Sequence, residues 1–210
     1  MQNILEDILT LLELGGPVVA ILLIVSVFGL ALTMRKFHQF SKVGTAALER
    51  LHLALDRWQS GEQKSAIDIF NSSSLVIAQD LRFALEQHSN MDEDYLYDEM
   101  LRRSSGFLRE YAKNLRILEL IYHLAPVLGL LGTVLGMIDA FRGLAVSAGT
   151  ATESTALAGG IWEALLTTAM GLSIAICFAV FHALLESRLE ALTDRVNETV
   201  SRALAMPASS

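Results

Sequence analysis

Three long, predominantly apolar runs alternate with polar stretches along this chain of 210 residues. They cover residues 17–34, 119–143 and 157–185. A helix needs about 20 such residues to cross a hydrocarbon core of about 30 Å, so each run has roughly the length of a transmembrane helix. The pattern therefore predicts an all-α membrane protein with three transmembrane helices.

The polar stretches repeat their apolar residues at helical spacing, and none shows the alternation of a β-strand. Residues 35–118 are predicted to form a helical cytoplasmic domain, into which the long second and third helices extend. Residues 144–156 form a small, polar outer loop, and residues 186–210 a cytoplasmic C-terminal helix and tail. Residues 1–16 set an apolar face against acidic side chains, which favours an interfacial helix on the outer surface.

The distribution of lysine and arginine orients the three spans, because cytoplasmic flanks carry an excess of positive charge. No Lys or Arg precedes Pro17, whereas Arg35, Lys36 and Lys42 follow the first run. Positive side chains also precede the second run and follow the third. The N-terminus is therefore predicted to lie outside and the C-terminus in the cytoplasm.

The amino-acid composition mainly argues against particular classes of function. The chain is 52% hydrophobic, with a net charge of −7 and a mean hydropathy of +0.44. This acidic balance argues against a nucleic-acid partner, whose phosphates require clustered positive charge. Cys177 is the only cysteine, and the five histidines show no metal-ligand spacing, so the sequence predicts no disulfide, metal or cofactor. The absence of a nucleophile–base pair disfavours an enzyme.

Glu163 is the only formally charged residue among the 29 of the third run. A charged side chain at the centre of a membrane helix costs about 2.5–3.5 kcal/mol on insertion scales, so such residues are usually functional. If Glu163 faces protein or water, it can bind and release protons. Because it is the seventh residue of the run, the alternative is a carboxylate that simply reaches the membrane surface.

Hydroxyl side chains lie in the same spans as this carboxylate, at Thr133, Thr167 and Thr168. On a straight helix Glu163 and Thr167 are about 40° apart, whereas Thr168 is about 140° away. Helical geometry therefore pairs Glu163 with Thr167. The alternative for any single threonine is a hydrogen bond to a carbonyl of its own helix.

Small residues recur at close intervals in the second and third spans. The positions that matter most are Gly129, Gly132, Gly136, Gly171 and Ala175. Helix association in lipid depends on small residues that let two backbones approach closely. The pattern predicts tight helix packing and leaves open whether the contacts lie within one subunit or between subunits.

Two segments carry a specific resemblance to a known family. APVLGLLGTVLGMIDAF (125–141), followed by LAGGIWEALLTTAMGLSIAI (157–176), resembles the paired signature of the MotA/TolQ/ExbB proton-channel family. Three spans fit its ExbB and TolQ branches better than the four-span MotA branch. By motif, Thr133 and Thr168 correspond to the family's pore threonines and Glu163 to its third-span glutamate. Thr167 stands where ExbB-like proteins often have alanine, so motif and geometry favour different threonines.

The resemblance implies a proton-channel subunit of a bacterial inner-membrane motor that uses the proton motive force. Such a subunit forms a homopentamer around two copies of a single-span ExbD/TolR-like partner, and a TonB- or TolA-like protein is a further candidate partner. The N-terminus and residues 144–156 would then face the periplasm, and membrane lipid would surround the spans. The motor would energise transport, as ExbB does, or another envelope process.

Alternatives remain open beside this ExbB-like function. One is a TolQ-like motor subunit for envelope maintenance, and another is a non-conducting membrane scaffold. Two departures from the family pattern also stand out. Cys177 and Phe178 follow Ile176 where a proline is common, and Asp139 replaces a residue that is frequently neutral and polar.

Overall fold

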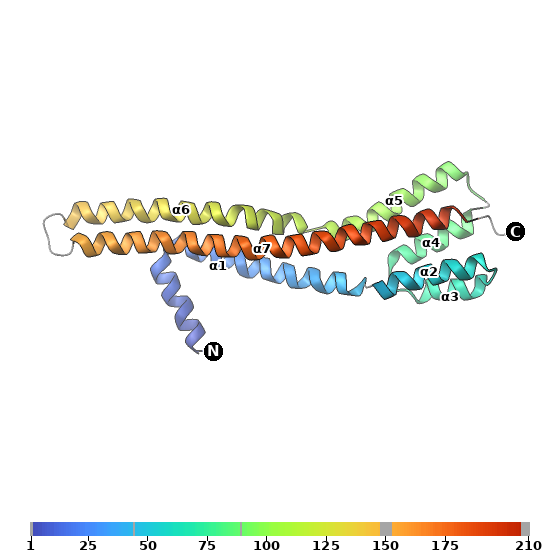
Figure 1. Ribbon diagram of the computed structural model, residues 1–210, viewed down its shortest axis with the longest axis horizontal. Coiled ribbons are helices and arrows are strands. Elements are labelled where there is room, and N and C mark those ends of the chain that lie inside the picture. The colour runs from blue at the N-terminus through green and yellow to red at the C-terminus, as the bar shows by residue number, and fades with distance from the viewer. Residues whose placement is uncertain (1, 44, 89, 148–152, 207–210) are drawn as a thin grey trace. The chain divides into compact units, whose positions relative to one another are not determined.

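The computed structural model describes residues 2–43, 45–88, 90–147 and 153–206 (Figure 1). The helices of these ranges are α1 (Gln2–Lys42), α2 (Thr45–Gln59), α3 (Gln63–Ser72), α4 (Val76–Gln87), α5 (Glu93–Ala112), α6 (Leu115–Ser147) and α7 (Glu153–Leu204). No β-strand occurs within the same ranges. The loop predicted at 144–156 lies partly outside them, and its flanks, up to Ser147 and from Glu153, are helical.

Three stretches of this described chain are helical, long and apolar enough to cross a membrane. They lie within Gly16–Ser41, Glu93–Ala145 and Leu157–Leu204, and each contains one of the predicted runs. The predicted fold class is therefore confirmed: the protein is an all-α membrane protein with three candidate membrane-spanning helices. α7 continues well beyond the third apolar run, to Leu204, as the sequence predicts. The second helix does not extend in the same way, because the helix breaks between α5 and α6 at Asn114, which has φ 69°.

α1 is broken at Gly16, where two helical stretches meet at a kink. Gly16 has φ 60° and ψ −164°, a backbone conformation that is open essentially only to glycine. Pro17 follows directly, and it suits the first turn of a helix because its missing N–H has no partner to lose there. The segment predicted at 1–16 thus corresponds to the part of α1 before the kink, and the first apolar run begins in the helix that follows it.

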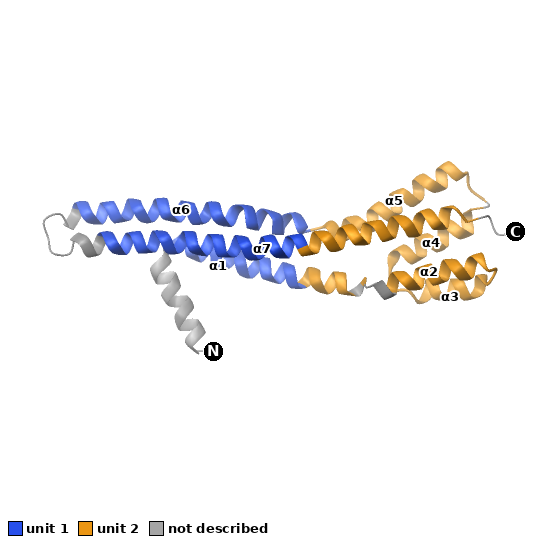
Figure 2. Cartoon of the chain, viewed as in Figure 1, with its two compact units in different colours: residues 1–34, 114–183 blue, residues 35–113, 184–210 orange. Residues whose placement is uncertain are grey.

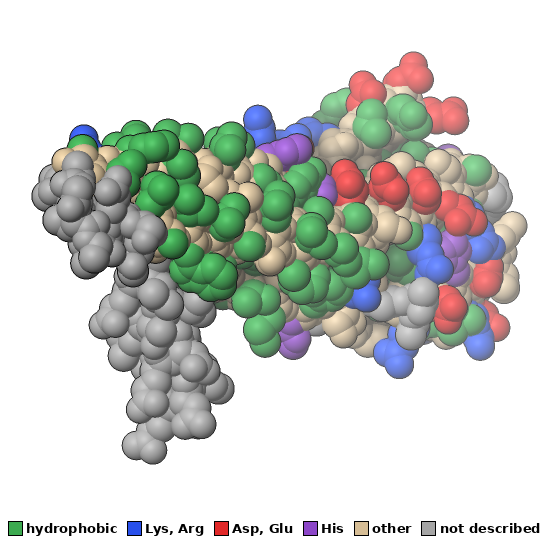
Figure 3. Space-filling view, turned by 60° about the vertical axis from the view of Figure 1, so that its left-hand side comes forward, with side chains coloured by type: hydrophobic (Ala, Val, Ile, Leu, Met, Phe, Trp, Pro, Cys, Tyr) green, Lys and Arg blue, Asp and Glu red, His purple; other side chains and the backbone are tan. Residues whose placement is uncertain are grey.

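Residues 1–34 and 114–183 form one compact unit, called the membrane unit below (blue in Figure 2). Val19, Leu22 and Ala125 are among its buried core residues. Its surface nevertheless carries large exposed apolar side chains such as Val127 and Ile176. Figure 3 shows hydrophobic side chains spread widely over the left-hand part of the visible face, where few charged groups lie. Such a large apolar surface suits lipid or neighbouring membrane helices rather than water.

Residues 35–113 and 184–210 form a second compact unit, called the second unit below (orange in Figure 2). Within it α2 packs against α3, α3 against α4, and α4 against α5. Gly61, with φ 83°, makes the tight turn between α2 and α3. The fully buried side chains of this unit include Leu51, Leu55, Phe70, Leu81, Met100 and Val196. The unit therefore has a hydrophobic core of its own.

One lysine of the second unit is buried. Lys36 is only 3% exposed. Its ammonium group donates hydrogen bonds to the Tyr111 carbonyl at 2.8 Å and to Gln39 Oε1 at 2.9 Å, with a longer one to the Glu110 carbonyl at 3.4 Å. These two carbonyls lie in the last turn of α5, which ends at Ala112. A positive charge is favourable there, because the helix C-terminus carries partial negative charge.

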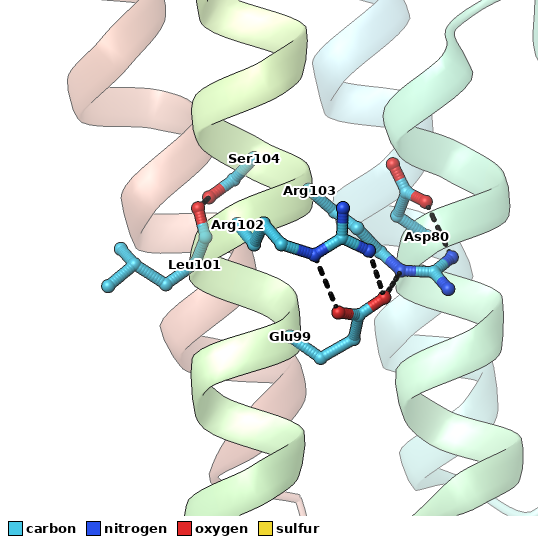
Figure 4. Close-up of polar contacts among 6 residues, drawn as sticks. All are labelled: Asp80, Glu99, Leu101, Arg102, Arg103 and Ser104. Carbon is cyan, nitrogen blue, oxygen red and sulfur yellow. Dashed lines mark hydrogen bonds and ion pairs between the residues drawn. The ribbon is translucent and has the colours of Figure 1, made fainter.

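A charged cluster on the surface joins α4 to α5 (Figure 4). Glu99 accepts hydrogen bonds from Arg102 at 2.8 Å and from Arg103 at 2.7 Å. Arg103 also donates to Asp80 of α4 at 3.0 Å and lies 4.1 Å from the ring centre of Phe83. Exposed ion pairs contribute only about 0.2–1 kcal/mol each, so this cluster adds to the apolar packing of α4 on α5 rather than replacing it.

Candidate functional site

The candidate site lies where α6 and α7 of the membrane unit pack closely together. A Cβ added to Gly132 would lie 2.5 Å from Thr167 Cβ, and one added to Gly136 would lie 3.0 Å from Ala164 Cβ. A Cβ on Gly171 would lie 2.5 Å from the backbone oxygen of Ala125. These distances are too short for any side chain, so the glycines meet the facing helix of the same chain. The question left open by the sequence is thereby answered for these positions, whose contacts lie within the subunit.

Thr167 and Thr168 converge on a single carbonyl of α6. The Thr167 hydroxyl, which has a single proton, lies 2.7 Å from the Ala164 oxygen of its own helix and 3.2 Å from the Gly129 oxygen, so it donates mainly to Ala164 and only secondarily to Gly129. The Thr168 hydroxyl donates to the same Gly129 oxygen at 3.1 Å. A Cβ on Gly129 would lie 3.0 Å from the backbone carbonyl oxygen of Thr167. Glycine at this position therefore lets the two helices come this close. Both threonines therefore connect α7 to α6.

Thr133 lies apart from these two threonines. Its hydroxyl donates to the Leu130 oxygen of α6 at 2.6 Å, which is the own-helix alternative that the sequence left open. The side chain lines a shallow, apolar hollow on the surface of α6, whose other lining residues are Val134, Met137, Ile138, Phe141, Arg142 and Ala145. Thr133 is thus directed away from the contact between α6 and α7.

Glu163 is half-buried, and its carboxylate lies against the break in α1. A Cβ on Gly16 would lie 2.8 Å from Glu163 Oε1. The expected pairing with Thr167 is absent, because the Thr167 hydroxyl donates to the carbonyls of Ala164 and Gly129. Among the residues that the structure describes, no hydrogen bond or ion pair engages the Glu163 carboxylate. The contact with Gly16 could not be predicted from the sequence, although the Gly15-Gly16-Pro17 motif indicates an interrupted helix there.

The remaining predicted packing position, Ala175, faces the core of the membrane unit. It is buried with Val18, Leu22 and Ala125, which brings α1, α6 and α7 together. Deeper along α1, a Cβ on Gly29 would lie 2.5 Å from Phe178 Cζ. These contacts pack α1 against α7 from Val18 to Gly29.

Other polar groups do not extend the candidate site. Asp139 is exposed and lies 3.5 Å from Arg142 in an ion pair within α6. Cys177 is exposed. Over the described ranges, no group of three or more His, Cys, Asp or Glu side chains is placed to hold a metal ion.

Comparison with known proteins identifies the family of this chain. Residues 71–198 match the MotA/TolQ/ExbB proton channel family. The chain belongs to this family. The matched region runs from the end of α3 through most of α7, so it includes Glu163 and the three threonines Thr133, Thr167 and Thr168.

Individual relatives agree with this assignment. The chain is 26% identical over 201 residues to an ExbB homolog of Methanothermobacter thermautotrophicus, an alignment that covers 92% of this chain and 68% of that one. It is 31% identical over 137 residues to the biopolymer transport protein ExbB of Helicobacter pylori, covering 63% and 90%. It is 36% identical over 115 residues to the Tol-Pal system protein TolQ of Pseudomonas aeruginosa, covering 53% and 49%. The protein is thus a multi-pass membrane subunit of a transport-type family.

Proposed function

We propose that this chain is the proton-channel subunit of an inner-membrane motor in bacteria, driven by the proton motive force. It would act as a homopentamer with an ExbD/TolR-like single-span partner, with its N-terminus in the periplasm and its C-terminus in the cytoplasm. The energised process would be transport, as the names of the ExbB relatives describe for those proteins. Family membership supports the motor class, and the similarity to TolQ keeps a role in envelope maintenance as the second candidate.

One observation carries the proposal: a carboxylate on a membrane-spanning helix that no described side chain neutralises. Glu163 is half-buried, and no hydrogen bond or ion pair within the described ranges engages it. A scaffold has no need of such a group, because partly burying a charge without a partner costs free energy and joins no helices. A proton carrier does need it, because the group must exchange its proton with a mobile donor or acceptor.

The depth of Glu163 supports access from the periplasm. Gly29 of α1 lies level with Phe178 of α7, so the end of the first apolar run at Met34 lies near the level of Ala183. Twenty residues separate Glu163 from Ala183 along α7. At 1.5 Å per residue this is about 30 Å, the thickness of the hydrocarbon core. We therefore place Glu163 at the outer boundary of the core, where it would receive protons from the periplasm.

The threonines would provide polar groups beyond this access point. Thr167 and Thr168 lie four and five residues deeper on α7, or about 6–7.5 Å toward the cytoplasm. Their hydroxyls donate to carbonyls, so their oxygens can still accept a hydrogen bond from water or a protonated partner carboxyl. Thr133, on the separate hollow of α6, would face the partner's helix or a neighbouring subunit.

The test is proton uptake into proteoliposomes that contain the chain and its ExbD/TolR-like partner. Glu163→Gln keeps the size of the side chain and removes its charge, so uptake should fall while the oligomer mass stays the same. Asp139→Asn is a matched control, because Asp139 is also a carboxylate of the membrane unit but is exposed and paired with Arg142. If Glu163→Gln conducts protons at the wild-type rate, the proton role of Glu163 is wrong, and a scaffold role becomes the better explanation.

A further inference from the structure

The break in α1 at Gly16 and the carboxylate of Glu163 fit each other closely. The Gly16 backbone adopts a conformation that other residues essentially never take. A Cβ at this position would lie 2.8 Å from Glu163 Oε1 and 4.0 Å from its carboxyl carbon. The backbone conformation therefore requires glycine at position 16, and a Cβ there would also push the flexible end of the Glu163 side chain away from α1.

The break also determines what surrounds the carboxylate. A free glutamate side chain has several rotamers, and fixing one of them costs conformational entropy. The neighbouring Thr167 hydroxyl donates its single proton to the backbone carbonyls beside it, mainly that of Ala164, instead of to the carboxylate. The α1 backbone at Gly16 is therefore what limits the position of the carboxylate on this side. A helix restarts at Pro17, and the N-terminus of a helix carries partial positive charge, which attracts a carboxylate.

We infer that Gly16 is a positioning residue for Glu163. Its missing side chain lets the carboxylate lie against the start of the first span, at the outer boundary of the membrane. The functional part of this inference rests on the proposed proton role of Glu163. The positioning itself concerns the contact between Gly16 and the Glu163 carboxylate, which lie 147 positions apart in the chain. This contact can be tested without any transport measurement.

The first experiment replaces Gly16 in the chain assembled with its partner. Gly16→Ala places a methyl group against the carboxylate, and displacing a functional group by about 1 Å can cost up to about a hundredfold in rate. We expect proton uptake to fall about tenfold. Gly159→Ala is the matched control, because Gly159 lies on α7 four residues before Glu163 and no atom lies within 4 Å of its added Cβ. This control should conduct like the wild type.

A second substitution separates the contact from backbone strain. Glu163→Asp shortens the side chain by one methylene and withdraws the carboxylate from the added methyl group. Residues in direct contact show couplings equivalent to about twofold or more. We therefore expect Gly16→Ala to lower uptake about threefold less in a Glu163→Asp background than in the wild type. If Gly16→Ala fails to accumulate in the membrane, the double variant should restore accumulation. An equal fold-loss of uptake in the two backgrounds, or no restored accumulation, would overturn the inference, because the backbone alone would then explain the effect.

A third measurement distinguishes this inference from the proposed function. Carbodiimide modification of Glu163 is followed by mass spectrometry on the purified chain. Gly16→Ala should displace the carboxylate from α1 and raise the modification rate about twofold or more, whereas Gly159→Ala should leave it unchanged. An unchanged rate in Gly16→Ala would overturn the positioning role. The result holds even if Glu163→Gln conducts normally, in which case only the proton role is wrong.

Discussion

Gly171→Ala tests how closely α6 and α7 depend on each other. The added Cβ would lie 2.5 Å from the Ala125 oxygen and 3.0 Å from the Gly129 Cα, against 3.4 Å for ordinary van der Waals contact. Both neighbours are backbone atoms of α6, so no side chain can rotate out of the way. The helices must separate by nearly 1 Å or shift along each other.

The size of the effect follows from two opposing terms. Overpacking a close contact costs about 1–3 kcal/mol. Replacing glycine by alanine inside a helix gains about 0.8–1 kcal/mol. Gly159→Ala brings the same gain without a contact, because nothing lies within 4 Å of its Cβ. The difference between the two variants therefore isolates the clash, and we expect Gly171→Ala to be about 1–3 kcal/mol less stable than Gly159→Ala.

The assay is unfolding of the purified chain in mixed micelles with increasing dodecyl sulfate, followed by tryptophan fluorescence. Trp162 lies on α7 in the membrane unit and reports on this helix. Separation of α6 from α7 would also loosen the hydrogen bonds that Thr167 and Thr168 make to Gly129. Equal unfolding midpoints for the two alanine variants would refute the reasoning, since α6 and α7 would then tolerate the added methyl group.

Two further predictions concern hydrogen bonds. Lys36→Met should lower the melting temperature more than Arg35→Met, because it removes a buried donor from the carbonyls at the end of α5, worth about 1–3 kcal/mol. Equal shifts in a thermal melt would contradict this role of Lys36. Thr167→Val and Thr168→Val should each cost about 0.5–1.5 kcal/mol, and the double variant more than their sum, because either hydroxyl alone still engages the Gly129 oxygen. Strictly additive losses in dodecyl sulfate unfolding would show that the two bonds act independently.

The three membrane helices could be predicted because their evidence is local. A run of apolar residues has the same meaning wherever it packs, so 17–34, 119–143 and 157–185 all lie in helices that satisfy the requirements of a span. Small residues such as Gly132 and Gly136 also indicated close packing. They could not indicate the facing helix, because a glycine permits approach by any backbone. The structure identifies that helix as α7 of the same chain.

The details of the site depended on contacts between distant residues. The rotation angle between Glu163 and Thr167 correctly puts them on neighbouring faces, but the threonine hydroxyl has closer acceptors. One is the carbonyl of Ala164 in its own helix, and the other is the Gly129 carbonyl that close packing brings within 3.2 Å. Only the fold likewise places the end of α5 beside Lys36. Hydrophobic periodicity describes one helix at a time, so it predicts neither the acceptors of the Thr167 hydroxyl nor the surroundings of Lys36.

In the proposed function, the distribution of polar groups along α7 predicts that the chain alone conducts protons poorly. Glu163 and the hydroxyls of Thr167 and Thr168 cover only the outer part of a path of about 30 Å. Deeper on α7, the Ser173 hydroxyl donates to the Ala169 oxygen of its own helix, and the sequence holds no carboxylate between Glu163 and Glu186. A proton at the threonines would therefore need a carrier from another chain to continue toward the cytoplasm. The exposed hollow beside Thr133 is an apolar surface on which such a membrane helix could pack. We therefore expect proton conduction to depend on a partner chain, because the polar groups of α7 end near the threonines.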